Sequence, residues 1–129
     1  IRVALDMTEE WQKAAETNGE EATLITGVVI ARNDFIAEHP EAVELFLEQY
    51  AASVDYVTSN VSDAAQLVGN YDIVAAPVAE KAIPYCNITC ITGNEMKQKL
   101  SSYLTVLAEQ NPAAVGGALP EDDFYYNAD

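Results

Sequence analysis

The hydrophobic pattern of the chain is mostly that of helices. Its longest run lies in residues 40–57, where apolar residues recur every three or four positions: Val43, Phe46, Leu47, Tyr50, Ala51, Val54 and Val57. This spacing predicts one helix of about four turns with a single apolar face. Pro40 suits its first turn, because proline lacks the N–H that a first turn leaves unpaired.

Shorter patterns predict four more helices and one short turn. Asn33 is expected to cap a short turn before His39, and Thr8 to cap a helix over residues 9–16 that stops at Gly19. A helix over residues 60–68 has Ser62 as its expected cap, and another begins at Ala76-Pro77 and stops near Pro84. Thr92 and Glu95 form a capping-box pattern for a helix that ends at Asn111-Pro112.

Three segments predict strands: residues 1–5, 22–32 and 87–91. In the second, Val28, Val29 and Ile30 are consecutive β-branched residues, a pattern typical of a strand buried on both faces of a parallel sheet. Gly27 precedes them and would allow a bend or a close backbone approach. The predicted fold class is therefore α/β, rich in helices and with few strands.

Charge narrows the possible partners. The 129 residues contain 21 acids and six bases, a formal net charge of −15, which disfavours nucleic acid and anionic lipid as partners. No apolar run approaches the roughly 20 residues of a membrane-spanning helix. The sequence also lacks a phosphate-binding loop, a nucleophile elbow and a paired-histidine metal motif, so we expect no cofactor, no metal and no catalytic turnover.

A few reactive or aromatic side chains have structural interpretations. Cys86 and Cys90 would lie about 13 Å apart in an extended segment, so a disulfide needs a turn at Asn87, and we favour two free thiols. Trp11 is expected in a core or interface, and His39 at a helix start. The acids at 121–123 are expected in solvent, whereas residues 124–126, Phe-Tyr-Tyr, are expected to pack.

Three segments resemble the C-terminal half of bacterial ABC-importer solute-binding proteins of the nitrate, sulfonate, taurine and thiamine-precursor type. They are residues 27–35 (GVVIARNDF) continuing through 39–43 (HPEAV) to Phe46-Leu47, residues 79–87 (AEKAIPYCN), and residues 116–126 (GGALPEDDFYY). The resemblance covers most of residues 26–126. It implies the two-lobed architecture of periplasmic-binding-protein type II folds, with a small molecule held between the lobes.

The resemblance also implies a division of the chain. Residues 1–25 would end the second lobe, residues 26–30 would form a hinge or crossover strand, and residues 31–129 would return to the first lobe as helices. The chain would then be a C-terminal fragment, with exposed apolar faces that associate with the missing N-terminal half or with a second copy. Further implied partners are a small-molecule solute and a membrane permease, and the implied location is the periplasm or, as a lipoprotein, the cell surface.

Four residues are candidates for contact with the solute. Thr26 and Gly27 lie where a hinge strand would face the cleft; Thr26 offers a hydroxyl and Gly27 an unobstructed N–H. Cys86 and Asn87 are the second pair, because loops at strand ends often line such clefts.

Two other functions remain open from the sequence. One is an enzyme on the same two-lobed architecture, similar to some menaquinone- and pyrimidine-pathway proteins, with His39 or Cys86 as the reactive group. The other is an all-helical interaction module with acidic faces for a basic partner, and the expected burial of residues 28–30 argues against it.

Overall fold

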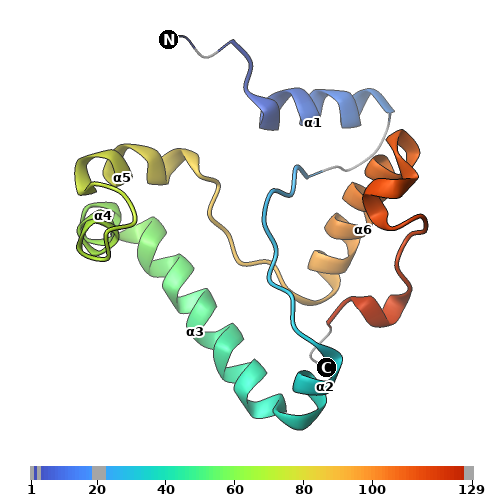
Figure 1. Cartoon of the computed structure of the whole chain (residues 1–129). Helices are drawn as coiled ribbons and strands as arrows, with labels where there is room; N and C mark the ends of the chain where they lie inside the picture. The colour runs from blue at the N-terminus through green and yellow to red at the C-terminus, as the bar shows by residue number, and fades with distance from the viewer. Residues whose placement is uncertain (1, 3, 19–22, 127–129) are drawn as a thin grey trace. The chain divides into compact units, whose positions relative to one another are not determined.

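The computed structural model describes residues 2, 4–18 and 23–126 (Figure 1). The chain divides into two compact units. The central unit comprises Ala31–Cys90, and the terminal unit comprises Ile1–Ile30 together with Ile91–Asp129.

The central unit is built from helices. It contains α2 (Asn33–Glu38), α3 (Pro40–Ser59), α4 (Val61–Asn70), α5 (Ala76–Ala82) and the 3-10 helix η1 (Ile83–Tyr85). The long helix α3 confirms the prediction from the apolar repeat: Val43 is buried and Leu47 and Val54 are half-buried. Pro40 lies at its start, as expected.

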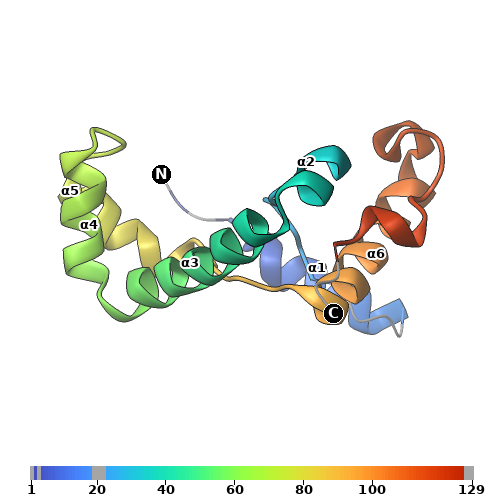
Figure 2. The same ribbon diagram turned by 90° about the horizontal axis from the view of Figure 1, so that it is seen from below.

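The core of the central unit lies where α4 and α5 pack side by side (Figures 1 and 2). Ala64 and Ala65 of α4 and Ala79 of α5 are almost fully buried there. Gly69 lies so close to α5 that a Cβ atom on it would be 3.1 Å from the Cβ of Ala76. Small residues thus let the two helices approach, but they remove little apolar area from water.

The terminal unit consists of α1 (Met7–Asn18), an open segment over residues 23–30, α6 (Gly93–Gln110) and the 3-10 helices η2 (Pro112–Val115) and η3 (Asp122–Phe124). α6 ends before Pro112, as predicted, and η2 packs on it. Gly116 and Gly117 then adopt positive φ angles of 78° and 95°, which glycine accepts without strain.

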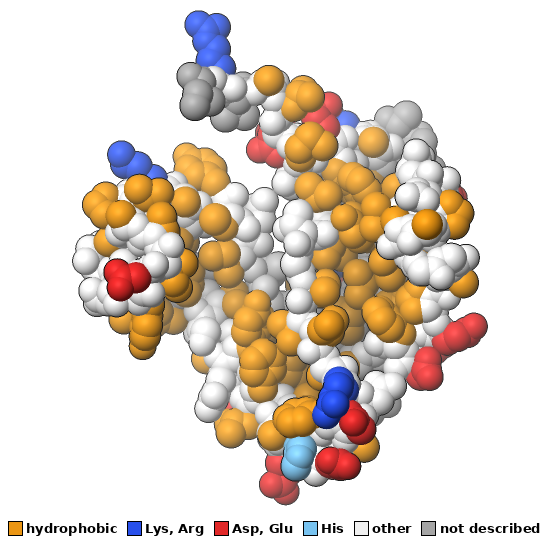
Figure 3. Space-filling view, viewed as in Figure 1, with side chains coloured by type: hydrophobic (Ala, Val, Ile, Leu, Met, Phe, Trp, Pro, Cys, Tyr) orange, Lys and Arg blue, Asp and Glu red, His pale blue; other side chains and the backbone are white. Residues whose placement is uncertain are grey.

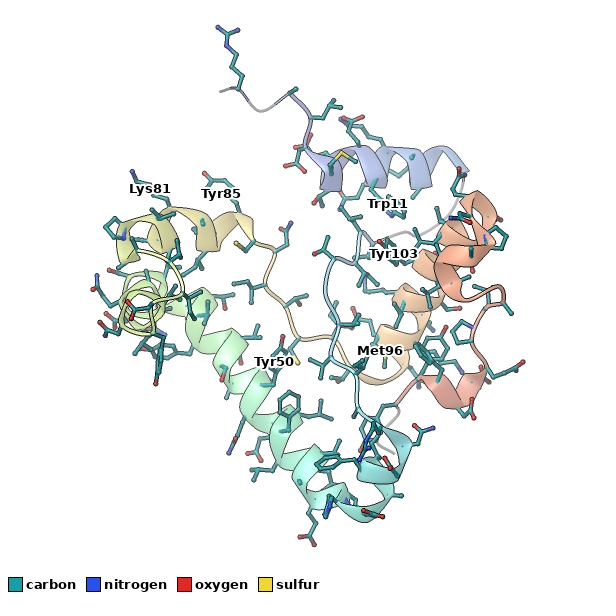
Figure 4. The ribbon with its side chains drawn as sticks, viewed as in Figure 1. Trp11, Tyr50, Lys81, Tyr85, Met96 and Tyr103 are labelled. Atoms are coloured by element: carbon teal, nitrogen blue, oxygen red, sulfur yellow. The ribbon has the colours of Figure 1, made fainter. Side chains whose placement is uncertain are left out.

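Side chains of the terminal unit hold α1 and the C-terminal turns against α6. Trp11 packs on Tyr103 with ring centroids 5.3 Å apart (Figure 4), which confirms its expected packing role. Lys97 Nζ lies 2.9 Å from Asp122 Oδ1 and 5.9 Å from the centre of the Tyr125 ring. Tyr125 is buried, as the aromatic run predicted, whereas Phe124 is 57% exposed.

The predicted strands are wrong over the described residues, which contain helices but no β-strand; residues 1, 3 and 22 lie outside them. The α/β class is corrected accordingly to a helix-rich fold. Val28, Val29 and Ile30 were expected to be buried but are 61%, 59% and 83% exposed. The reason is that β-branched residues favour a strand only where a neighbouring strand can pair with it, and the described part of the chain contains no such strand. In the third predicted strand, residues 87–91, Asn87 has a φ angle of +49°. This left-handed conformation interrupts an extended segment.

Several helix caps also differ from the prediction. Asp6, rather than Thr8, caps α1: its Oδ1 accepts hydrogen bonds from the N–H groups of Thr8 (2.9 Å) and Glu9 (3.3 Å). α4 begins after Asn60 rather than Ser62. Thr92 does precede α6, but its side chain makes no capping hydrogen bond.

Asn33 is the first residue of α2, not its cap. The expected stop at Gly19 lies outside the described residues. The division into a second-lobe end (residues 1–25), a hinge strand (26–30) and a return to the first lobe (31–129) stays a prediction. The two compact units are defined by packing within this chain, which does not test membership of a lobe.

Candidate functional site

Thr26 and Gly27 lie in the open segment of the terminal unit. Both are exposed, and nothing lies within 4 Å of the position that a Cβ atom on Gly27 would occupy. Gly27 is also not among the glycines with positive φ. The backbone around Gly27 is therefore accessible to a ligand, while the fold of the unit does not itself require a glycine there.

Lys99 of α6 contacts the same open segment. Its Nζ donates a long hydrogen bond of 3.5 Å to Thr23 Oγ1, and it lies 3.7 Å from Glu95 Oε1 one turn earlier. Lys99 is half-buried. The positive charge of Lys99 therefore lies beside Thr23, three residues before Thr26. The sequence alone did not predict this contact, because α6 is remote from Thr23 along the chain.

Cys86 and Asn87 directly follow η1 in the central unit, and both are exposed. The thiol of Cys86 donates to the carbonyl oxygen of Ala82 at 3.3 Å, one turn back. Cys86 and Cys90 are free thiols, as favoured from their spacing. The positive φ of Asn87 turns the chain out of η1, a role that asparagine tolerates better than most residues.

Each candidate pair thus belongs to one unit: Thr26 and Gly27 to the terminal unit, Cys86 and Asn87 to the central unit. The assignment of these four residues to a ligand stays a prediction.

Two shallow hollows occur elsewhere in the described structure. One, of about 440 Å³, lies on the polar side of α6 and is lined by Asn94, Lys97, Gln98, Ser101, Ser102 and Thr105. These residues are spaced by three and four, as on one polar face of a helix. This spacing is the sequence feature from which the polar face could have been predicted. The hollow is open along a single helix, unlike the enclosed, largely apolar pockets that usually bind small molecules.

The second hollow surrounds His39, between α2 and α3, and is lined by Glu38, His39, Pro40, Glu41 and Ala42. The imidazole packs against Phe35 with ring centroids 4.9 Å apart. His39 links the two helices, because it ends α2 and precedes α3. This agrees with the helix-start role expected for it.

Three titratable groups of α1, Glu9, Glu10 and Lys13, form a local surface cluster. Lys13 Nζ lies 2.7 Å from Glu10 Oε1 and 3.7 Å from Glu9 Oε2. The hydrogen bond and charge of Glu10, helped by Glu9, raise the pKa of Lys13. All three residues lie on one helix surface, where such pairs stabilise helices only slightly.

Across the described residues, no group of three or more His, Cys, Asp or Glu side chains could hold a metal ion. None of the helices that the structure describes has the length and apolarity needed to span a membrane.

Comparison of the chain with protein-family models, with curated proteins and with solved structures found no match.

Proposed function

We propose that this chain is part of a solute-binding protein of an ABC importer, in which Thr26, Gly27, Cys86 and Asn87 face a small molecule between two lobes. The proposal rests on the three resembling segments within residues 26–126. In it, the remainder of the protein supplies the strands that the described residues lack, and the whole works outside the cytoplasm with a membrane permease.

One structural observation carries the proposal: the exposure of Val28, Val29 and Ile30, at 61%, 59% and 83%. Exposed apolar area costs roughly 25 cal/mol per Å² compared with burial, so three consecutive β-branched residues favour a partner that covers them. A strand from the remainder of the protein fits best, because no backbone hydrogen bond joins this open segment to the other described residues. Thr26 and Gly27 would then enter the sheet at its edge, beside the ligand.

Ligand-induced stabilisation tests this function. The chain, produced together with any coding sequence upstream of it, is screened by thermal shift against sulfonates, nitrate, pyrimidines and amino acids. A ligand that binds only the folded protein raises its melting temperature in proportion to RT ln(1 + [L]/Kd). Stabilisation by none of these solutes, together with turnover of some substrate, would refute the proposal.

Two variants then test the site. Gly27→Val adds a side chain where the structure leaves space, so we expect an unchanged melting temperature without ligand and a lost ligand shift. Thr26→Val removes one hydroxyl at constant size and should weaken binding about five- to tenfold, the value of one hydrogen bond.

Thr58→Val is the matched control. It removes a hydroxyl that bonds only to the carbonyl oxygens of its own helix, Val54 at 2.9 Å and Asp55 at 3.2 Å, and should leave binding unchanged. If Thr26→Val and Thr58→Val lose equal ligand affinity, Thr26 does not contact the ligand.

A further inference from the structure

The last described part of the chain, residues 116–126, folds back onto α6 as a strap. Figures 1 and 2 show it returning along α6 after η2. In the described structure no backbone hydrogen bond joins the strap to α6. Its own backbone bonds are local, such as those from Phe124 N to Glu121 O at 3.1 Å and from Tyr125 N to Asp122 O at 3.3 Å. The strap is therefore held by side chains rather than by its backbone.

Lys97 of α6 contacts the strap at two residues. Its Nζ lies 2.9 Å from Asp122 Oδ1 and 5.9 Å from the centre of the Tyr125 ring. Tyr125 is the one buried residue of the strap, and Phe124 packs edge-on against it with ring centroids 5.3 Å apart. The acids of η3 are exposed, and Figure 3 shows acidic side chains at the surface where η3 lies. The attachment of the strap thus concentrates on one buried ring and one ion pair, which meet at Lys97.

These contacts are weak ones. The side chain of Asp122 is 91% exposed and that of Lys97 is 36% exposed, and an ion pair so open to solvent stabilises a fold only slightly. A cation near the face of an aromatic ring adds a similarly small amount. Segments with few buried apolar contacts open locally at a free energy well below that of global unfolding. The strap, with a single buried side chain, is such a segment.

Two glycines form a pivot at the start of the strap. Gly116 and Gly117 have φ angles of 78° and 95°, and nothing lies within 4 Å of the position of a Cβ atom on either. Glycine moves between positive and negative φ at little cost, so two consecutive glycines in open space allow the chain after them to swing. The preceding helix η2 packs on α6, which fixes the place from which the strap turns.

We propose that residues 116–126 open and close as a unit about Gly116 and Gly117, with Lys97 as the latch. Opening separates Lys97 from Asp122 and exposes the ring of Tyr125 to solvent. It also frees Lys97 inside the hollow of about 440 Å³ on α6, where it is the one charged side chain among the described lining residues. The strap therefore decides whether this hollow presents an unpaired positive charge. Its opening does not depend on the proposed solute binding, which involves other residues.

Limited proteolysis of the full chain with chymotrypsin, followed by mass spectrometry, tests the proposal. Chymotrypsin cleaves after aromatic residues in extended segments, so it cuts after the buried Tyr125 only when the strap is open. The cleavage rate measures the open population when opening and closing are faster than cleavage. Addition of about 1 M urea should raise the rate after Tyr125 less than about twofold, because opening of the strap exposes little surface. Cleavage after Tyr103 within α6 needs larger unfolding and should rise at least about fivefold, both rates being normalised to a peptide substrate.

Two lysines of α6 give a matched pair of variants. Lys97→Met removes the charge at similar length and should raise cleavage after Tyr125 about three- to tenfold, because both contacts of the latch are lost. Lys99→Met is the control, since the ammonium of Lys99 contacts Glu95 and Thr23 rather than the strap. It should leave cleavage after Tyr125 unchanged.

Gly117→Ala tests the pivot. Alanine disfavours a φ angle of +95°, so this variant should bias the strap away from its closed position and raise cleavage after Tyr125 about three- to tenfold. Gly27→Ala, at a glycine without positive φ, should leave that rate unchanged. The proposal is overturned if cleavage after Tyr125 rises with urea as steeply as cleavage after Tyr103. It is also overturned if Lys97→Met and Lys99→Met have equal effects, or if Gly117→Ala has none.

Discussion

Trp11 is the one tryptophan of the chain, and its packing on Tyr103 joins α1 to α6. The ring centroids are 5.3 Å apart and the ring planes are tilted by 46°. The indole Nε1 is buried and has no hydrogen-bond acceptor among the described residues. The contact is therefore favoured by apolar burial and ring geometry, while the buried N–H group opposes it. Ring packing must outweigh that cost if α1 is to stay on α6.

A double-mutant cycle measures this contact. We expect Trp11→Ala and Tyr103→Ala each to lower the free energy of unfolding by about 1–3 kcal/mol, since both rings are half-buried. The double variant should lose less than the sum of the two, by about 0.5–1.5 kcal/mol. Urea unfolding followed by circular dichroism provides the values. Tyr71→Ala changes a side chain that is 77% exposed; it serves as the control and should change stability little. If the losses of Trp11→Ala and Tyr103→Ala are strictly additive in the double variant, the two rings do not interact.

Single-residue roles could be predicted from the sequence only in part. The packing of Trp11 and Tyr125 follows from the rarity of aromatic residues in solvated tails and short surface helices. The caps did not follow, because Asp6 and Thr8 are both suitable residues and only the local backbone decides which carboxylate or hydroxyl reaches the free N–H groups. The contact of Lys99 with Thr23 links positions far apart in the sequence, which no local pattern reveals.

Between elements, α4 and α5 approach each other closely at Gly69. A Cβ atom there would lie 3.1 Å from Ala76 Cβ and 3.2 Å from Ala76 N. Gly69→Val should therefore push the two helices apart and lower the free energy of unfolding by about 1–3 kcal/mol, the usual cost of overpacking. Gly27→Val is the same substitution at an open position and should cost much less. Equal costs, measured by urea unfolding, would show that the α4–α5 approach is not close.

The contrast between helices and strands has a physical origin. A helix satisfies its own backbone hydrogen bonds, so the apolar repeat of residues 40–57 and the prolines at 40, 77 and 112 were enough to predict α3, α5 and the end of α6. A strand depends on a neighbour that its own sequence does not specify. Val28–Ile30 therefore has the composition of a buried strand but lies exposed, and Asn87 turns the chain where another strand was expected.

For the molecule as a whole, the candidate site depended on a resemblance rather than on visible chemistry. Thr26, Gly27, Cys86 and Asn87 are exposed, as contact with a ligand requires, but exposure is common among polar and loop residues and does not single them out. Binding a solute needs only a few placed polar groups, so it leaves no motif as specific as a metal-ligand set.

The excess of 21 acids over six bases acts on the whole chain and predicts its response to salt. Like charges at i, i+3 and i, i+4, such as Glu41, Glu44 and Glu48, destabilise a helix by a few tenths of a kcal/mol per pair. Raising NaCl from about 20 to about 300 mM shortens the screening length from roughly 20 to roughly 6 Å and should weaken this repulsion. We expect the melting temperature, followed by circular dichroism, to rise by about 3–8 °C. The double variant Glu44→Gln, Glu48→Gln should start higher and rise less, whereas a melting temperature that falls with salt would mean that attractive ion pairs dominate.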